Sequence, residues 1–90
     1  MTIQIYKTRI PIMYPNESCT VELPGSLVTI EQQEGRFVAY SNTAQPNETY
    51  QFIFLQTGYE VDLPTEAKYI KTFMLDEGFY VLHIYGVRIV

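Results

Sequence analysis

The sequence holds few of the residues on which catalysis and metal binding usually depend. It contains one cysteine, Cys19, and one histidine, His83, and it has no tryptophan. A single cysteine excludes an internal disulfide and favours a reducing compartment. A structural zinc ion needs three or four nitrogen or sulfur ligands, which one thiol and one imidazole cannot supply. We therefore predict no metal site, no cofactor and no catalytic residues, because the spacing of Cys19 and His83 does not favour a catalytic pair.

Positive charge is also scarce. Six Lys and Arg residues stand against ten Asp and Glu residues, which gives a formal net charge of -4. Proteins bind duplex nucleic acid with clustered Lys and Arg that neutralise phosphates, and here the cations are scattered along the chain. The glycine-rich motifs that hold dinucleotides or nucleoside triphosphates are absent as well. The sequence thus predicts that duplex nucleic acid is not a partner.

Long hydrophobic runs are missing too. No segment approaches the roughly 18 uninterrupted apolar residues of a membrane span, and the first residues lack the apolar centre of a signal peptide. We expect no membrane partner and a cytosolic protein. A chain of 90 residues is expected to form a single domain over 1–90, since a second core would leave each half too small to fold unaided.

What the chain does have is apolar and aromatic surface. Apolar residues make up 47% of the sequence, and eight tyrosines and five phenylalanines provide its aromatic rings. This is more large apolar surface than one small core readily buries. The excess favours a homo-oligomer or a face that binds a partner.

Short runs of Ile, Val, Tyr, Phe and Thr alternate with turn residues, a pattern typical of antiparallel sheets. We predict an all-β, mainly antiparallel fold, a small β-sandwich or rolled barrel of six to seven strands with little helix. The predicted strands cover residues 3–10, 19–23, 26–33, 36–42, 49–57, 68–75 and 79–85. Glu34-Gly35 is expected to form a tight hairpin and Asp76-Glu77-Gly78 a three-residue hairpin loop, while residues 65–68 form at most a turn.

Two of these runs are apolar on both faces. In 49–57, Tyr50, Phe52 and Phe54 alternate with Gln51, Ile53 and Leu55. In 79–85, one face carries Phe79, Val81, His83 and Tyr85, and the other carries Tyr80, Leu82 and Ile84. Strands of this kind are expected in the middle of a packed structure or in a subunit interface. A lone histidine in such a strand is expected to be packed with one hydrogen bond.

The stretch LQTGYEVDLPTEAKYIKT contains the longest connection in the carboxyl-terminal half. Loops carry function more often than the strands that hold them, so we predict partner contacts here. Gly58 would permit a conformation that presents Tyr59, with Glu60 and Asp62 as a polar rim. The predicted partner-binding residues are Thr57, Gly58, Tyr59, Glu60, Asp62 and Tyr69.

An alternative is a small nucleotide ligand held between subunits. Lysine or arginine side chains, among them Lys68, Lys71, Lys7 or Arg9, would meet its phosphates while a tyrosine or phenylalanine stacks on its base. The residues predicted for such a ligand site are Lys68, Lys71, His83 and Tyr85.

Several stretches are similar to a family of small, uncharacterised proteins from tailed bacteriophages. The similar pieces follow the family's order and cover most of the chain: IYKTRIP, TVELPGSLVTIEQQEGRFVAYSN, FLQTGYEVDLP and YIKTFMLDEGFYVLHIY. The shared motifs are short and mostly structural, such as Thr57-Gly58 and the closing strand with His83. Family members often have a histidine directly after the Thr-Gly pair, where this chain has Tyr59.

The resemblance implies a β-rich protein with no assigned activity that works in the cytoplasm of an infected bacterial host. Small phage proteins without catalytic residues are frequently counter-defence factors. We therefore predict a non-catalytic inhibitor of the anti-CRISPR type that binds a host defence protein stoichiometrically. The alternatives are an oligomeric sponge for an immune signalling nucleotide and a minor phage structural or assembly protein.

Overall fold

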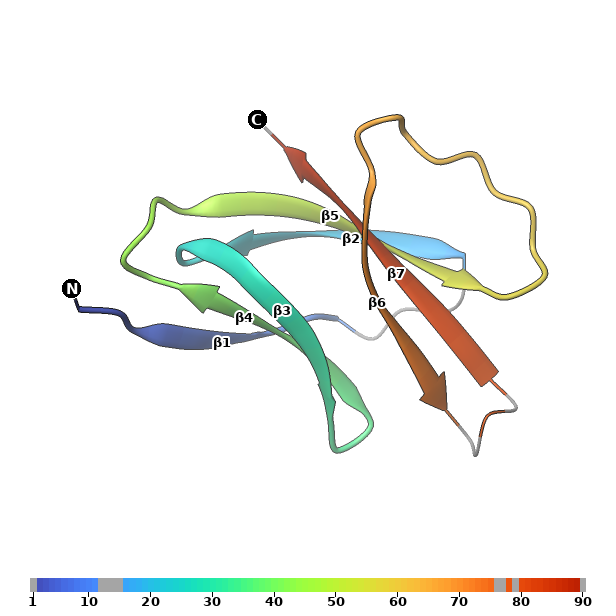
Figure 1. Cartoon of the computed structure of the whole chain (residues 1–90), viewed down its shortest axis with the longest axis horizontal. Coiled ribbons are helices and arrows are strands. Elements are labelled where there is room, and N and C mark those ends of the chain that lie inside the picture. The colour runs from blue at the N-terminus through green and yellow to red at the C-terminus, as the bar shows by residue number, and fades with distance from the viewer. Residues whose placement is uncertain (1, 12–15, 76–77, 79, 90) are drawn as a thin grey trace.

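A computed structural model describes residues 2–11, 16–75, 78 and 80–89. These residues form seven strands and no α-helix (Figure 1). The strands are β1 (Ile5–Arg9), β2 (Glu17–Leu23), β3 (Ser26–Gln33), β4 (Arg36–Asn42), β5 (Glu48–Gln56), β6 (Lys68–Leu75) and β7 (Tyr80–Ile89). A helix able to cross a membrane is not present in this part of the chain.

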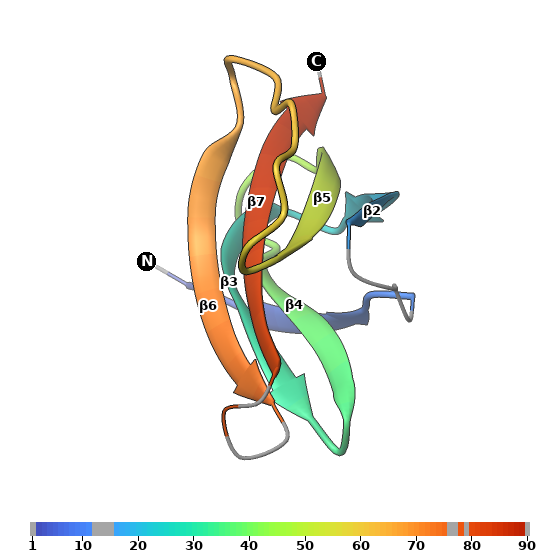
Figure 2. The same ribbon diagram turned by 90° about the vertical axis from the view of Figure 1, so that its right-hand side faces the viewer.

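The strands build two antiparallel sheets. One sheet has three strands in the order β1-β4-β3, and the other has four in the order β2-β5-β7-β6. The chain passes between the sheets after β1, β2 and β4, so that the two sheets face each other (Figure 2). The prediction of an all-β, antiparallel fold is confirmed, and of the two predicted architectures the sandwich is the one observed.

The core lies between the inner faces of the two sheets. Phe37 of the three-stranded sheet makes edge contacts with Phe54 at 5.2 Å and with Phe73 at 5.1 Å between ring centroids. Both partner rings belong to the four-stranded sheet, so this aromatic cluster joins the sheets. The buried core cluster consists of Ile10, Leu23, Ile30, Phe37, Ala39, Phe52, Phe54, Phe73, Leu82 and Ile84.

The two strands that are apolar on both faces, β5 and β7, are the central pair of the four-stranded sheet, as predicted. The predicted alternation is confirmed: Phe52, Phe54, Leu82 and Ile84 belong to the core. Phe79, which the prediction placed with His83, lies outside the described residues. The alternate side chains of β5 and β7 point away from the three-stranded sheet, to what we call the outer face.

The last strand is longer than predicted, since β7 continues through Gly86 to Ile89. Gly86 is buried opposite Phe52, and a Cβ there would lie 2.6 Å from Cδ1 of Ile70. The missing side chain leaves room for Ile70, which would have to shift to admit a methyl group, and Gly86 does not end the strand. The first strand is shorter than predicted, covering Ile5–Arg9 of the expected 3–10.

Two predicted turns are observed. Glu34 and Gly35 have φ values of 50° and 74°, the positive pair that a two-residue hairpin between β3 and β4 requires. The expected turn in 65–68 is also present, closed by a 3.0 Å hydrogen bond from the Ala67 amide to the Pro64 carbonyl. Of the predicted loop 76–78, the first two residues lie outside the described part of the chain.

The connection between β5 and β6 crosses the four-stranded sheet. Both strands are antiparallel to β7, so they run parallel to each other and cannot be joined by a tight hairpin. Segment 57–67 returns over the outer face, in front of β7 in Figure 2. Val61 and Pro64 line a pocket with Ile53, which is only 8% exposed although it points away from the core. The crossover therefore covers part of the outer face.

Candidate binding site

Strand register assembles a set of outward-facing residues on the four-stranded sheet. Leu55 of β5 lies opposite His83 of β7, which in turn lies opposite Thr72 of β6. The next row on this face contains Ile53, Tyr85 and Tyr69. These rows put a polar line, His83 and Thr72, beside a pair of tyrosines on one surface.

The polar residues form a continuous hydrogen-bonded line across the outer face. The Oγ1 of Thr57 lies 2.6 Å from Nε2 of His83, and the Oγ1 of Thr72 lies 3.0 Å from Nδ1 of the same ring. The line ends at Tyr69, whose hydroxyl lies 2.7 Å from the Thr72 Oγ1. His83 therefore makes two hydrogen bonds where one was expected, and both ring nitrogens are held in place.

A pocket of about 290 Å³ opens over the Thr57–His83 end of this line. Its lining residues are Leu55, Gln56, Thr57, Gly58, Tyr59, His83 and Tyr85. The Thr57-Gly58 turn brings the crossover to the sheet here, and Gly58 has a φ of 95°, which only glycine adopts readily. The pocket thus joins loop residues predicted to bind a protein with strand residues predicted to bind a ligand.

Large side chains stand exposed around the pocket. Tyr59 is 63% exposed, Tyr69 is 56% exposed and Met74 is 75% exposed. The ring of Tyr69 meets that of Tyr85 edge-on at 5.7 Å between centroids. We call Tyr59, Tyr69, Met74 and Tyr85 the aromatic surface. Rigid rings and a flexible thioether at this density are typical of binding faces.

The line has one feature of a nucleophilic site and lacks another. A threonine hydroxyl at 2.6 Å from an imidazole has the distance of a nucleophile and its base. The other ring nitrogen, however, meets the neutral hydroxyl of Thr72, which cannot stabilise an imidazolium as a carboxylate would. Hydroxyls can donate or accept, so the line can adapt to a partner's donors and acceptors.

Other predicted residues lie elsewhere. Lys71 forms an ion pair with Glu31 of β3 and lies over the ring of Phe73, so it does not join His83. Lys68 is exposed at the start of β6, opposite Gly86. Asp62 lines a second pocket, of about 300 Å³, on the part of the outer face near β2. Glu60 is exposed on the crossover.

The sequence reasoning missed Thr72 and Met74. A register shift between Tyr69 and Lys71 changes which residues of β6 face outward. Strict alternation from Tyr69 would put Phe73 on the outer face, whereas the bulge turns Phe73 into the core and Thr72 and Met74 outward. The run Phe73-Met74-Leu75 contained the only sequence signal for this bulge. Its first and last residues, Phe73 and Leu75, are more apolar than Met74 and are therefore the better candidates for the core.

Cys19 and His83 do not form a pair. Cys19 packs against the core from β2, while His83 lies on the outer face of β7. Burial raises the pKa of the Cys19 thiol above its ordinary value, which lowers the fraction of reactive thiolate near neutral pH.

We predict that iodoacetamide alkylates Cys19 of the folded protein at least about tenfold more slowly than that of the urea-unfolded chain at mildly alkaline pH. Mass spectrometry over a time course measures the alkylation rates of the folded and the unfolded chain. The raised thiol pKa of the folded state also makes the free energy of unfolding depend on pH: stability that is present below the ordinary thiol pKa is lost as the pH rises through the folded value. Equal rates would contradict the inner-face placement of Cys19.

Fold and site together define a two-sheet, all-β protein with a crossover segment and an exposed aromatic surface on one sheet. The chain belongs to the family described as a domain of unknown function (DUF7352), whose model matches residues 1–89. The predicted membership of an uncharacterised family is confirmed, and the phage source stays a prediction. No curated protein and no solved structure matches the chain.

Proposed function

We propose that the protein is a non-catalytic binding protein that engages another protein stoichiometrically through the outer face of its four-stranded sheet. The observation that carries this proposal is the aromatic surface, where Tyr59, Tyr69 and Met74 are each more than half exposed. Tyrosine and methionine are enriched at protein interfaces, and tyrosine offers large contact area at small entropic cost.

The arrangement of polar groups supports a specific contact. The line Thr57–His83–Thr72–Tyr69 ends at one of the exposed rings, and its hydrogen bonds hold its side chains in fixed positions. A partner that covers the rings would bury these hydroxyls and the imidazole, so it must offer matching polar groups. Apolar contacts thus provide affinity and the polar line provides selectivity.

Charge indicates what kind of partner surface fits. The crossover beside the aromatic surface carries Glu60, Asp62 and Glu66, all exposed. Lys68 is the basic residue that follows them in the chain, and Lys71 is already paired with Glu31. An acidic rim of this kind favours a partner with a basic surface and speeds their encounter.

The resemblance to phage proteins supports a more specific role within this proposal. A counter-defence factor of the anti-CRISPR type would bind a host defence protein in the cytoplasm of an infected bacterium. Nucleic-acid-binding defence proteins carry the basic surfaces that an acidic inhibitor can cover. A homo-oligomer remains compatible with this proposal, provided the aromatic surface stays open to the partner.

The test is capture of host proteins on the immobilised chain, followed by affinity measurement with the purified partner. We expect Tyr69→Ala and Tyr59→Ala each to weaken the affinity by about tenfold or more, the size of a hot-spot residue. Glu60→Lys should slow association and make it less sensitive to salt. Tyr6→Ala is the matched control, because Tyr6 is similarly exposed, at 53%, but belongs to β1 of the other sheet.

A captured protein supports the proposal only if it responds to these variants. Loss of affinity in Tyr6→Ala with full affinity in Tyr69→Ala and Tyr59→Ala would move the interface to the three-stranded sheet and refute the proposed surface.

A further inference from the structure

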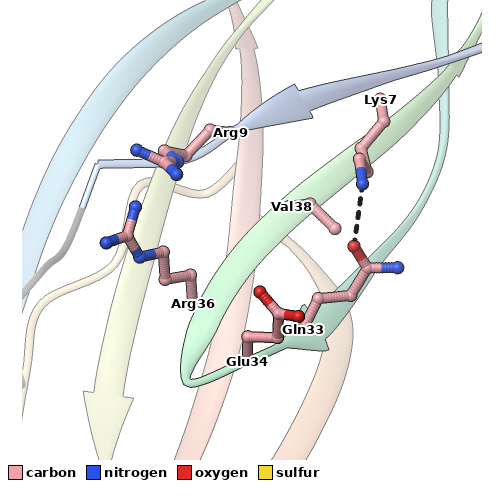
Figure 3. Close-up of a pocket in the computed structure, with 6 residues that line it drawn as sticks. All are labelled: Lys7, Arg9, Gln33, Glu34, Arg36 and Val38. Atoms are coloured by element: carbon pink, nitrogen blue, oxygen red, sulfur yellow. Dashed lines mark hydrogen bonds between the residues drawn. The ribbon is translucent and has the colours of Figure 1, made fainter.

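The three-stranded sheet carries a basic pocket on the face that points away from the four-stranded sheet. Its lining residues are Lys7, Arg9, Gln33, Glu34, Arg36 and Val38, and its volume is about 220 Å³ (Figure 3). Three of the six basic residues of the chain thus meet at one end of one sheet. In a chain with a formal net charge of -4, this is a local reversal of sign.

Strand pairing brings the three cations together. Lys7 and Arg9 stand two residues apart on β1 and therefore point to the same side. Arg9 lies opposite Val38 of β4, and Arg36, two residues before Val38, points to that side as well. The tight turn at Glu34-Gly35 closes the end of the pocket. Sequence separation hid this cluster, because Arg9 and Arg36 are neighbours only after β1 pairs with β4.

The positive charges of the pocket are poorly neutralised. Ion pairs among the described residues join Lys71 to Glu31 and Arg88 to Glu48, and none includes a cation of the pocket. The ammonium group of Lys7 donates to the neutral amide oxygen of Gln33 at 3.0 Å.

The two guanidinium groups of Arg9 and Arg36 end near each other in Figure 3. Like charges on neighbouring strands are destabilising, and a bound anion removes that cost.

We propose that this pocket binds a phosphoryl group. Guanidinium groups present paired N–H donors that match phosphate oxygens, and the lysine adds a mobile point charge. Gln33 holds the lysine in place, because its amide oxygen accepts from Lys7 while its amide nitrogen donates to the hydroxyl of Tyr40 at 2.7 Å. The carboxylate of Glu34 lines the same pocket and opposes an anion, so it lowers the affinity.

The size of the pocket limits what it can hold. A volume of about 220 Å³ is below the roughly 300–1,000 Å³ of typical small-molecule sites. The pocket can enclose one phosphoryl group, and the remainder of a phosphate ester would lie outside it. Free phosphate and a phosphate monoester are the two sources of this chemistry.

The experiment is a titration of the isotope-labelled protein with inorganic phosphate at low ionic strength, followed by amide and arginine side-chain NMR signals. We expect saturable shifts in β1 and in the β3–β4 hairpin, with millimolar affinity. Arg9→Ala and Arg36→Ala should each weaken binding by about tenfold, and Arg36→Lys should weaken it less. Glu34→Gln should strengthen it. Arg88→Ala, an arginine of β7 on the other sheet, is the control and should bind as the unmodified chain does.

The same titration with a phosphate monoester separates the two sources, because a built ester site gives tighter binding and additional shifts outside the pocket. Shifts that fail to saturate, that chloride reproduces, or that persist in both Arg9→Ala and Arg36→Ala would overturn the proposal. Both arginines are exposed, so these variants are expected to fold, and a circular dichroism spectrum checks this. Partner capture through the aromatic surface is independent of the result, since the two sites lie on different sheets.

Discussion

Replacing Gly25 by alanine is expected to remove most of the free energy of unfolding. Gly25 has a φ of 114° and lies at the corner where the chain leaves β2 for β3. An added Cβ would overlap the backbone carbonyl of Asn42 and lie 2.8 Å from Cα of Thr43. Both obstacles are backbone atoms, which cannot rotate away as a side chain can.

The corner that this substitution disturbs joins both sheets. The Gly25 carbonyl accepts a 3.1 Å hydrogen bond from the Glu48 amide at the start of β5, and the neighbouring Pro24 carbonyl accepts one from the hydroxyl of buried Ser41. Moving the backbone to admit a methyl group breaks these contacts. We expect a loss of more than about 3 kcal/mol, most of the stability of a domain this small.

Denaturant unfolding of Gly25→Ala beside Gly35→Ala separates crowding from backbone strain. Gly35 also has a positive φ, 74°, but among the described residues other than its two chain neighbours no atom lies within 4 Å of a Cβ built there. Its substitution should cost only about 1 kcal/mol. Similar losses in the two variants would show that the Gly25 corner is not closely packed.

Phe54→Ala is the second large effect, with an expected loss of about 3–5 kcal/mol. The ring of Phe54 has no exposed surface and contacts Phe37 across the space between the sheets. Removing it leaves a cavity that the two paired sheets cannot close without breaking strand pairing.

Urea unfolding at equilibrium measures this loss, and Met74→Ala is the control. The substitution Met74→Ala also removes a long side chain, but Met74 is largely exposed on the outer face. This substitution should therefore change the free energy of unfolding by no more than about 0.5 kcal/mol. If Phe54→Ala were equally mild, the aromatic cluster between the sheets could not be the centre of the core.

Sequence periodicity predicted much of this fold. The runs around Phe52 and Leu82 are apolar on both faces, which is the property of central strands, and both strands are central. Gly35 indicated the hairpin, because glycine adopts the positive φ that a tight turn requires without a steric cost. The sequence did not indicate which strands belong to which sheet, because Pro24-Gly25 predicts a turn equally well whether the chain stays in one sheet or changes to the other.

The candidate site was predicted in its parts but not in its assembly. Gly58 and Tyr59 were correctly placed in a long connection, and His83 in a late strand, whereas Thr57 was assigned to the preceding strand and in fact lies in the turn after β5. Their meeting depends on the parallel arrangement of β5 and β6, which sends the connection back across β7. The bulge in β6 and the pairing of Arg9 with β4 are non-local in the same way, so Thr72 and the basic pocket were beyond a local reading of the sequence.

Hydroxyl-radical footprinting of the captured complex tests the proposed interface most directly, because tyrosine and methionine are reactive and the two sheets provide an internal comparison. In the free protein, Tyr59, Tyr69, Met74 and Tyr6 should all be oxidised, as their exposure requires. In the complex, we expect strong protection of Tyr59, Tyr69 and Met74 while Tyr6 of β1 reacts as before. Protection of Tyr6 with undiminished oxidation of Tyr69 and Met74 would contradict the assignment of the binding surface to the four-stranded sheet.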